Sequence, residues 1–251
     1  MSDFLKGKTA VITGGSRGLG KAMAIALAAE GVRIALVARD EAAMTEVANT
    51  IRKAGGEASC FKSDVTDEAA VATLEKEVLL QYGTVDILIN NAGINIRKPI
   101  HEFTLEEWRR VQDTNVTSVF LMCRAFVPHM KGKGYGRIFN MTSIMSHISL
   151  PGRAAYSSSK AALLGLTRAV ALELATEGIT VVGISPGPFA TEMNLPLINN
   201  PEANAKFLSS IPVGRWGNVD EIGKLTVFLC SEGAGFITGT DILIDGGWCA
   251  Q

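Results

Sequence analysis

Near its N-terminus the chain reads Thr9-Ala-Val-Ile-Thr-Gly-Gly-Ser-Arg-Gly-Leu-Gly-Lys-Ala-Met-Ala-Ile-Ala-Leu-Ala-Ala-Glu30. Its first five residues, Thr9–Thr13, are short and largely apolar, which predicts a buried strand. A glycine-rich turn follows over 13–20. The next residues, Gly20–Glu30, are rich in alanine and stop at Gly31, which indicates a helix with a glycine C-cap. Strand, glycine turn and helix together predict the first βα unit of a parallel sheet.

The same alternation continues to the end of the chain. The predicted strands are Thr9–Thr13, Arg33–Ala38, Ala58–Lys62, Asp86–Asn90, Arg137–Thr142, Thr180–Ser185 and Asp241–Ile244. The predicted helices are Gly20–Glu30, Glu41–Ala54, Asp67–Gln81, Thr104–Met130, Ala155–Thr176 and Val219–Cys230. Most of the strands are apolar on both faces, as buried parallel strands are. We therefore expect an α/β fold of the Rossmann type: a doubly wound, seven-stranded parallel sheet flanked by helices.

No linker or composition shift divides the chain, so we expect a single domain over residues 1–251. Its least regular part is 186–216, which contains five prolines. This segment is expected to be a loop with one or two short helices. Long ordered loops of this kind often act as lids, and we interpret 186–216 as a segment that covers a substrate.

Composition narrows the class of protein. The 251 residues carry a net charge of −1, which gives no indication of a nucleic-acid or anionic-membrane partner. The four cysteines are far apart and form no Cys-x-x-Cys pair, which favours free thiols in a reducing compartment. We find no signal-peptide pattern, no apolar run of transmembrane length and no metal-ligand cluster. A cytoplasmic protein without a membrane partner or a metal is expected.

The glycine turn has the features of a dinucleotide site. Glycines permit tight turns and the close approach of a pyrophosphate, and the helix N-terminus supplies unpaired N–H groups. The expected contacts are Gly14, Ser16, Arg17, Gly18, Leu19 and Gly20. Their spacing is Gly-x-x-x-Gly-x-Gly rather than the commoner Gly-x-Gly-x-x-Gly.

Tyr156 and Lys160 lie four residues apart at the start of a predicted helix, which places them on one face, one turn apart. An ammonium beside a phenol favours the phenolate and is expected to lower the pKa of the tyrosine. A tyrosine tuned in this way can give or take a proton in general acid–base catalysis.

These motifs, with Asn90-Asn91-Ala92-Gly93, Asn115, Ser143 and Pro186-Gly187, occur in the order typical of the short-chain dehydrogenase/reductase family, which the chain resembles over nearly its whole length. The resemblance implies an NAD(P)-dependent oxidoreductase that transfers a hydride between nicotinamide and a carbonyl or secondary alcohol. It implies four catalytic residues, namely Asn115, Ser143, Tyr156 and Lys160. Ser143 is expected to hold the substrate oxygen, and Asn115 to hold a water on the route to the lysine.

The second strand indicates which cofactor is used. Arg39 follows that strand and, with Arg17, would pair with a 2′-phosphate, so NADP(H) is favoured. NAD(H) stays possible, because Asp40 would reach the ribose if the register shifted by one, although Asp40 could instead be a helix N-cap. By resemblance, the remaining cofactor contacts are Asp64, Val65, Asn91, Ala92, Gly93, Tyr156, Lys160, Pro186, Gly187, Phe189 and Thr191.

The substrate is less clearly indicated. Polar candidates for the pocket are Asn95, Arg97, His147, Arg153, Glu192 and Asn194, with Met193 in the lid. Within the family, the stretches 93–99, 190–194, 214–217 and 245–250 resemble gluconate 5-dehydrogenases, which implies a keto-sugar acid. The alternative is a 3-oxoacyl-acyl-carrier-protein reductase, with Arg97, Lys98, Arg109 and Arg110 at the mouth of the site.

Two further classes of protein fit the sequence less well. A cofactor-sensing regulator without catalysis is disfavoured because the Asn–Ser–Tyr–Lys set is complete. A sugar-nucleotide epimerase usually has a different glycine spacing and a longer chain. The family commonly forms tetramers through two long helices, here 104–130 and 155–176, so a homotetramer is expected. Apolar side chains that could face partners or the chain's own sheet are Val119, Phe120, Phe126, Leu163, Leu166 and Phe228.

Overall fold

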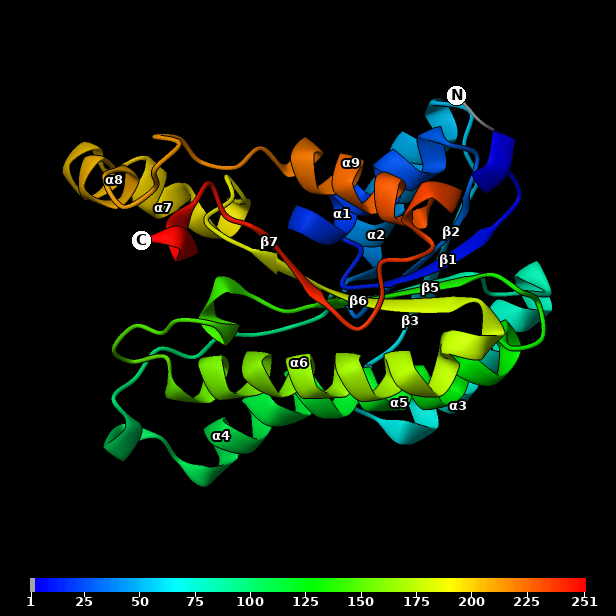
Figure 1. Ribbon diagram of the computed structural model, residues 1–251, viewed down its shortest axis with the longest axis horizontal. Helices are drawn as coiled ribbons and strands as arrows, with labels where there is room; N and C mark the ends of the chain where they lie inside the picture. Colours follow the sequence, from blue (N-terminus) through cyan, green and yellow to red (C-terminus); the bar gives the residue numbers. More distant parts are fainter. Residues whose placement is uncertain (1–2) are drawn as a thin grey trace.

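A computed structural model describes residues 3–251 as one seven-stranded parallel sheet between two layers of helices (Figure 1). The strand order is β3-β2-β1-β4-β5-β6-β7, and every neighbouring pair is parallel. The strands are β1 Thr9–Thr13, β2 Arg33–Ala38, β3 Ala58–Lys62, β4 Ile87–Asn90, β5 Gly136–Met141, β6 Ile179–Pro186 and β7 Asp241–Ile244. The predicted α/β fold and all seven strands are confirmed, with shifts of one residue at several ends.

The core forms two apolar layers, one on each face of the sheet. Alternate residues of one strand enter opposite layers, as Ile12 and Val11 do in β1. One face is covered by α1 Gly18–Ala29, α2 Glu41–Lys53 and α9 Val219–Cys230. The other is covered by α3 Glu68–Tyr82, α5 Ser118–Met130 and α6 Ala154–Leu174. This double cover explains why most strands read as apolar on both sides.

The helix expected over Thr104–Met130 is interrupted. Thr104 starts α4 (Leu105–Gln112) with a capping box to Glu107, and α5 follows after a π-helical turn over Asp113–Thr117. A π turn inserts one residue into a helix and re-aims the side chains that it carries. The turn holds Asn115, which is fully buried. The sequence analysis predicted helix throughout and missed this turn, because the residues on both sides of it are helical.

The segment over 186–216 contains three short helices: a 3-10 turn over Glu192–Asn194, α7 Leu195–Ile198 and α8 Pro201–Leu208. An aromatic cluster fastens α8. Phe207 stacks on Trp216 with ring centres 4.8 Å apart and lies 5.2 Å from the ring of Trp248. The segment therefore rests against the C-terminal tail, and both lie at the same end of the molecule (Figure 1).

Three of the apolar side chains considered for subunit contacts belong to the chain's own core, namely Val119, Phe126 and Leu163. Leu166 packs partly against the same layer. Phe120 and Phe228 are 48% and 51% exposed. Within residues 3–251, no helix is both long and apolar enough to cross a membrane.

Gly223 marks the closest approach of α9 to α1, and it gives a test of this packing. A Cβ at position 223 would lie 2.8 Å from Cβ of Ala26 and 3.1 Å from the carbonyl oxygen of Ala22. Overpacking of this kind costs about 1–3 kcal/mol, so we expect G223A to lower the free energy of unfolding by that amount in urea denaturation. The matched control is G233A, since a Cβ there meets only Ser231 Oγ at 3.7 Å. Equal stability of both variants would contradict the packing.

Candidate functional site

The sequence-predicted site residues gather at the carboxyl ends of the strands. The strand order reverses between β1 and β4, and ligands bind outside such switch points in open α/β sheets. The segment after β4 contacts the turn after β1 through Asn91 and lies against Lys160 of α6 at Gly93, and Lys160 in turn reaches the end of β5 at Met141. No group of three or more His, Cys, Asp or Glu side chains that could hold a metal occurs within residues 3–251.

The glycine turn is held in a conformation that only glycine fits. Gly14 and Gly18 have φ of 63° and 54°, and a Cβ at Gly20 would lie 2.4 Å from the carbonyl oxygen of Gly14. The Asn91 amide at the end of β4 donates to the carbonyl oxygens of Thr13 (2.9 Å) and Gly14 (3.1 Å). Asn91 thus holds the backbone of the glycine turn against the end of β4.

The N-terminus of α1 is open to an anion. Arg17 occupies its N-cap position without a side-chain hydrogen bond to the helix, whereas Asp40 and Asp67 cap α2 and α3. The first N–H groups of α1 therefore have no capping carboxylate. This glycine cradle and helix end fit a dinucleotide pyrophosphate. Thr191 lies against the turn, since a Cβ at Gly18 would be 3.8 Å from Thr191 Cγ2.

Two arginines lie where the adenosine end is expected. Arg17 pairs with Asp40 at 2.8 Å, and Arg39 lies 3.7 Å from Asp64. Asp40 also accepts a hydrogen bond from the Ala43 N–H, so both its oxygens are engaged and its N-cap role is confirmed. Asp64 accepts from the Thr66 N–H and hydroxyl, and these bonds lower the pKa of its carboxyl. Arg39 stays exposed, at 74% of its side chain.

Lys160 is buried on α6. Its side chain comes within 5.8 Å of the centre of the Tyr156 ring, and Nζ donates to the carbonyl oxygen of Met141 at 2.5 Å. Burial lowers the pKa of this ammonium to about 8. Taking a charged group out of water favours its neutral form, so Lys160 can change its charge near neutral pH.

Tyr156 behaves differently from the sequence-based expectation. Burial raises the pKa of its phenol, and the Ser143 hydroxyl, Arg153 and Arg97 offset this only in part. The sequence led us to expect a lowered pKa, and the pKa of the phenol is raised instead, because burial outweighs the groups that oppose it. The ammonium is directed to the carbonyl of Met141 rather than to the phenol, while two arginines supply the positive charge that acts on it.

Asn115 holds the segment after β4. Its Oδ1 accepts from the Ile94 N–H at 2.8 Å, and its Nδ2 donates to the Ile94 carbonyl and to Ser159 Oγ, both at 2.9 Å. Ser159 in turn donates to the carbonyl of Tyr156. A Cβ at Gly93 would lie 3.2 Å from Asn115 Oδ1 and 3.5 Å from Lys160 Nζ. The π turn therefore brings Asn115 beside both catalytic candidates of α6.

Ser143 follows β5 and is 7% exposed. Its Oγ accepts a hydrogen bond from the Met145 N–H at 3.1 Å, which leaves the hydroxyl proton available for donation. Its effect on the pKa of Tyr156 places it beside the phenol. Thr142 is directed away from Ser143, as expected for adjacent strand residues; its hydroxyl donates to Asp241.

The charges of Arg97, which is exposed, and of Arg153, which is half-buried, both act on the Tyr156 phenol. A hydrogen bond from the Lys98 N–H to the Gly152 carbonyl, 3.2 Å long, joins the two loops that carry them. Burial and the neighbouring Arg97 both lower the pKa of Arg153. Within residues 3–251, neither guanidinium has an ion pair with a carboxylate.

The other substrate candidates are placed as follows. Asn95 Oδ1 is buried and has no hydrogen-bond partner among the described residues. His147 is turned to Asp241, with Nε2 and Oδ2 2.7 Å apart. Glu192 is exposed, and the Asn194 amide donates to the carbonyl of Phe189. The side chain of Met193 lies outside what the structure describes.

The segment after β6 contributes its backbone. Gly187 donates to the Ile244 carbonyl, and a Cβ there would lie 2.6 Å from Asp245 Cα. Phe189 is buried in the core, so only its backbone faces the site. Val65, beside the expected adenine, is likewise buried.

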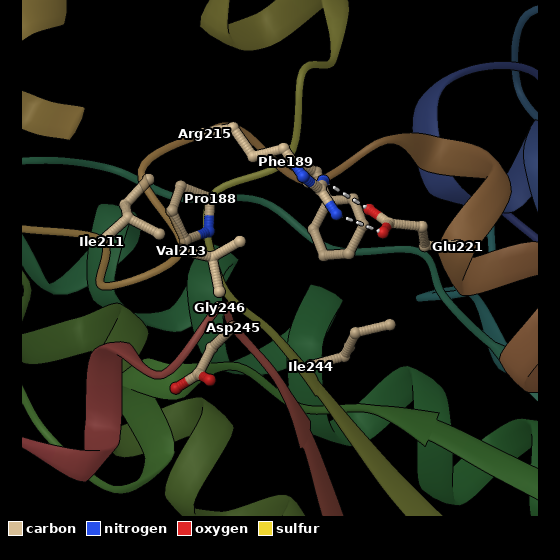
Figure 2. A pocket seen from close by; sticks show the side chains of 10 residues that line it. Pro188, Phe189, Ile211, Val213, Arg215, Glu221, Ile244, Asp245 and Gly246 are labelled. Carbon is tan, nitrogen blue, oxygen red and sulfur yellow. Dashed lines mark hydrogen bonds and ion pairs between the residues drawn. The ribbon is translucent and has the colours of Figure 1, made fainter.

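A cavity of about 240 Å³ lies behind this segment, between the start of α9 and the turn after β7 (Figure 2). Its lining is mostly apolar, and a two-pronged ion pair between Arg215 and Glu221 crosses one side. None of the four catalytic candidates lines it. It is therefore separate from the place where a substrate would meet Tyr156.

Several supporting residues were missed from the sequence. Ser159 orients Asn115, and the Thr13 hydroxyl accepts from the N–H groups of Asn91 and Ala92. Ser185 and Asp241 join the loop after β5 to the sheet. Ser159, one helical turn after Tyr156, could be expected near the pocket from its spacing, but its hydrogen bond to Asn115 was not predicted. The others depend on contacts between distant strands.

Comparisons with known proteins agree with this geometry. A family model described as enoyl-(acyl carrier protein) reductase matches residues 14–249. Among characterised relatives, 3β-hydroxysteroid dehydrogenase 1 of Eggerthella lenta is 40% identical over 249 residues, covering 98% of this chain and 95% of that protein. Gluconate 5-dehydrogenase of Gluconobacter oxydans is 37% identical over 243 residues, covering 97% and 95%.

Solved structures show the same fold. A candidate gluconate dehydrogenase from Agrobacterium tumefaciens superposes with a TM-score of 0.95 at 39% identity, covering 98% of both chains. A candidate NAD(P)-dependent gluconate 5-dehydrogenase from Beutenbergia cavernae, crystallised with NADP at low occupancy, gives 0.91 at 35% identity, again covering 98% of both chains. The chain therefore belongs to the short-chain dehydrogenase/reductase family and is an oxidoreductase of the class that acts on CH–OH or carbonyl groups.

Proposed function

We propose that the protein is an NADP(H)-dependent oxidoreductase that interconverts a keto-sugar acid and the corresponding hydroxy acid, as a gluconate 5-dehydrogenase does. The observation that carries the substrate assignment is the pair Arg97 and Arg153, which lies beside Tyr156 with no carboxylate partner in the described structure. Two guanidinium groups that influence the same phenol and have no carboxylate partner favour an anionic ligand.

The cofactor assignment rests on the glycine turn and its two arginines. The turn and the open N-terminus of α1 suit a pyrophosphate. Asp40 is engaged by Arg17 and by the α2 backbone, so it is poorly placed to accept from a ribose hydroxyl. Arg39 is exposed and only loosely paired, which suits a 2′-phosphate. The relative from Beutenbergia cavernae, which was crystallised with NADP, supports this assignment.

When bound, the nicotinamide supplies or accepts the hydride. Tyr156 donates a proton to the substrate oxygen during reduction and takes one back during oxidation. Ser143 donates a hydrogen bond to the same oxygen as negative charge develops on it. Arg97 and Arg153 oppose the effect of burial on the phenol and lower the cost of the phenolate.

Lys160 and Asn115 return a proton to Tyr156 after it has protonated the substrate oxygen. Lys160 has a pKa of about 8, so it exchanges protons readily at neutral pH. Asn115 Oδ1 accepts one hydrogen bond from Ile94 and keeps a second lone pair on the side of Gly93 and Lys160. This lone pair suits a water between the lysine and solvent.

The alternative, a 3-oxoacyl-acyl-carrier-protein reductase, draws support from the exposed pair Arg109 and Arg110 on α4 and from the matching family model. A carrier protein is acidic and would use such a surface. Lys98, the third cation considered, is already paired with Glu107 at 2.6 Å. The arginines at Tyr156 favour a small anion over a neutral thioester.

Three coarser features complete the proposal. We infer that 186–216 covers the bound substrate, since Thr191 borders the glycine turn and α8 is held through Trp216 and Trp248, which contact the Phe207 ring, and through a hydrogen bond from Trp216 Nε1 to Asn204. The exposed Phe120 and Phe228 support a homotetramer. Four free cysteines in the described chain suit a cytoplasmic location.

Tyr156 gives the first test. Y156F removes the proton donor and should lower kcat by about 10²–10⁴-fold, the contribution of general acid–base catalysis. Binding of NADPH, measured by fluorescence titration, should stay within about twofold of wild type. The control is Y82F, since the Tyr82 hydroxyl donates to the Ile34 carbonyl far from the site. Turnover of Y156F within tenfold of wild type would contradict the assignment.

The arginine pair gives the second test. R97Q and R153Q each remove one charge-assisted hydrogen bond, which is worth about 1.5–3 kcal/mol. We therefore expect KM for 5-ketogluconate to rise at least tenfold, with KM for NADPH unchanged. K98Q is the matched control, because Lys98 is paired with Glu107. If KM rises equally for an uncharged ketone, or does not rise at all, the anion assignment fails.

A further inference from the structure

A second buried polar cluster lies behind the loop that carries Ser143. Its centre is Asp241, the first residue of the edge strand β7, whose side chain is 9% exposed. Asp241 Oδ1 accepts from Thr142 Oγ1 at 2.6 Å. Its Oδ2 accepts from Ser185 Oγ at 2.6 Å and lies 2.7 Å from His147 Nε2. No lysine or arginine within residues 3–251 forms an ion pair with this carboxylate.

The partners of Asp241 surround Ser143 in the chain. Thr142 precedes it, and His147 follows it by four residues in the same loop. Ser185 Oγ lies 3.0 Å from the carbonyl oxygen of Ser143 itself. One carboxylate therefore holds both flanks of the loop, and the single proton of Ser185 can go either to this carboxylate or to the Ser143 carbonyl at the middle of the loop.

Ser185 extends the cluster to the cofactor segment. It is fully buried and immediately precedes Pro186-Gly187. The same carboxylate thus links the loop after β5 to the segment after β6. These are the two segments expected to hold the substrate oxygen and the nicotinamide.

The surrounding backbone is shaped to admit this side chain. Gly183 of β6 is paired with Asp241, and a Cβ at position 183 would lie 2.1 Å from Asp241 Oδ1. Any larger residue at 183 would displace the carboxylate. The position of Asp241 therefore requires a glycine at 183, although glycine weakens the interior of a strand.

The number of hydroxyl and imidazole protons limits which hydrogen bonds the cluster can form at one time. Thr142 and Ser185 have one hydroxyl proton each, and Ser185 lies within hydrogen-bond distance of Asp241 Oδ2, the Ser143 carbonyl and Thr142 Oγ1. When His147 carries a proton on Nε2, it donates to Oδ2. A carboxylate accepts all these donors at once, whereas an amide at the same position would face two of them with its own N–H₂ group.

We propose that Asp241, with His147 and Ser185, is the positioning group that fixes the Ser143 hydroxyl against the substrate oxygen. It touches neither the substrate nor the cofactor and acts only through the loop after β5. This inference rests on the proposed role of Ser143. Loss of the carboxylate lets the loop shift, and a displacement of about 1 Å at a reacting group can cost 10²-fold in rate.

The test is a double-mutant cycle between D241N and S143A. D241N alone should lower kcat by between tenfold and about 10²-fold, with the dissociation constant for NADPH within about twofold of wild type. In the S143A background, D241N should change kcat by less than about twofold, because coupled residues are non-additive. D86N is the structural control: Asp86 accepts from the Thr9 N–H on another strand, and its loss should affect stability rather than kcat.

If D241N folds poorly, His147 gives a second test. Its side chain is 32% exposed, so its replacement disturbs the core less. H147L should lower kcat severalfold, whereas H147Q, which keeps an N–H donor, should restore it to within about twofold of wild type. An equal loss from D241N in both backgrounds, or equal rates for H147L and H147Q, would overturn the positioning role alone. Full activity of S143A would remove both this role and the proposed role of Ser143.

Discussion

The close contact between the ends of β1 and β4 is the constraint on which the rest of the site depends. Here the strand order reverses, and the Asn91 amide bridges the carbonyls of Thr13 and Gly14. A Cβ at Gly20 would lie 2.5 Å from that amide, so the first turn of α1 requires a glycine at this position. This geometry aims the uncapped N-terminus of α1 into the same space as the segment after β4.

Around this point, the residues that suit the cofactor phosphates and the residues proposed to transfer protons come from different segments. The turn after β1 and the arginines that follow β1 and β2 suit the phosphates of the cofactor. The start of α6 brings Tyr156 and Lys160, and the π turn brings Asn115 to meet them. Burial is the main cause of both pKa shifts and favours the neutral form of each group. Lys160 is shifted by burial alone, whereas the shift of Tyr156 is moderated by two arginines and Ser143. The groups that oppose burial of the phenol therefore come from the loops after β4 and β5 and from the N-cap of α6.

Local pattern predicted most of the fold. Short apolar runs between glycine-ended helices gave all seven strands, and the motif spacing brought Ser143, Tyr156 and Lys160 to one place. What the pattern missed depends on contacts between distant segments. The π turn at Asn115 disturbs the helical period by one residue only. His147 was expected to line the substrate pocket, yet it is turned to Asp241, 94 residues away. Asp241 begins an edge strand, and nothing in the neighbouring sequence indicates that its carboxylate also accepts hydrogen bonds from the loop after β5.

The central claim is that a small anion is reduced beside Tyr156 with NADPH. The most direct measurement is the oxidation of NADPH and of NADH by the purified protein with 5-ketogluconate, an uncharged ketose and a 3-oxoacyl thioester. The account predicts that kcat/KM is highest for 5-ketogluconate with NADPH, and at least tenfold above the uncharged ketose, as loss of one charge-assisted hydrogen bond requires. Turnover of the thioester alone, or a preference for NADH, would contradict it.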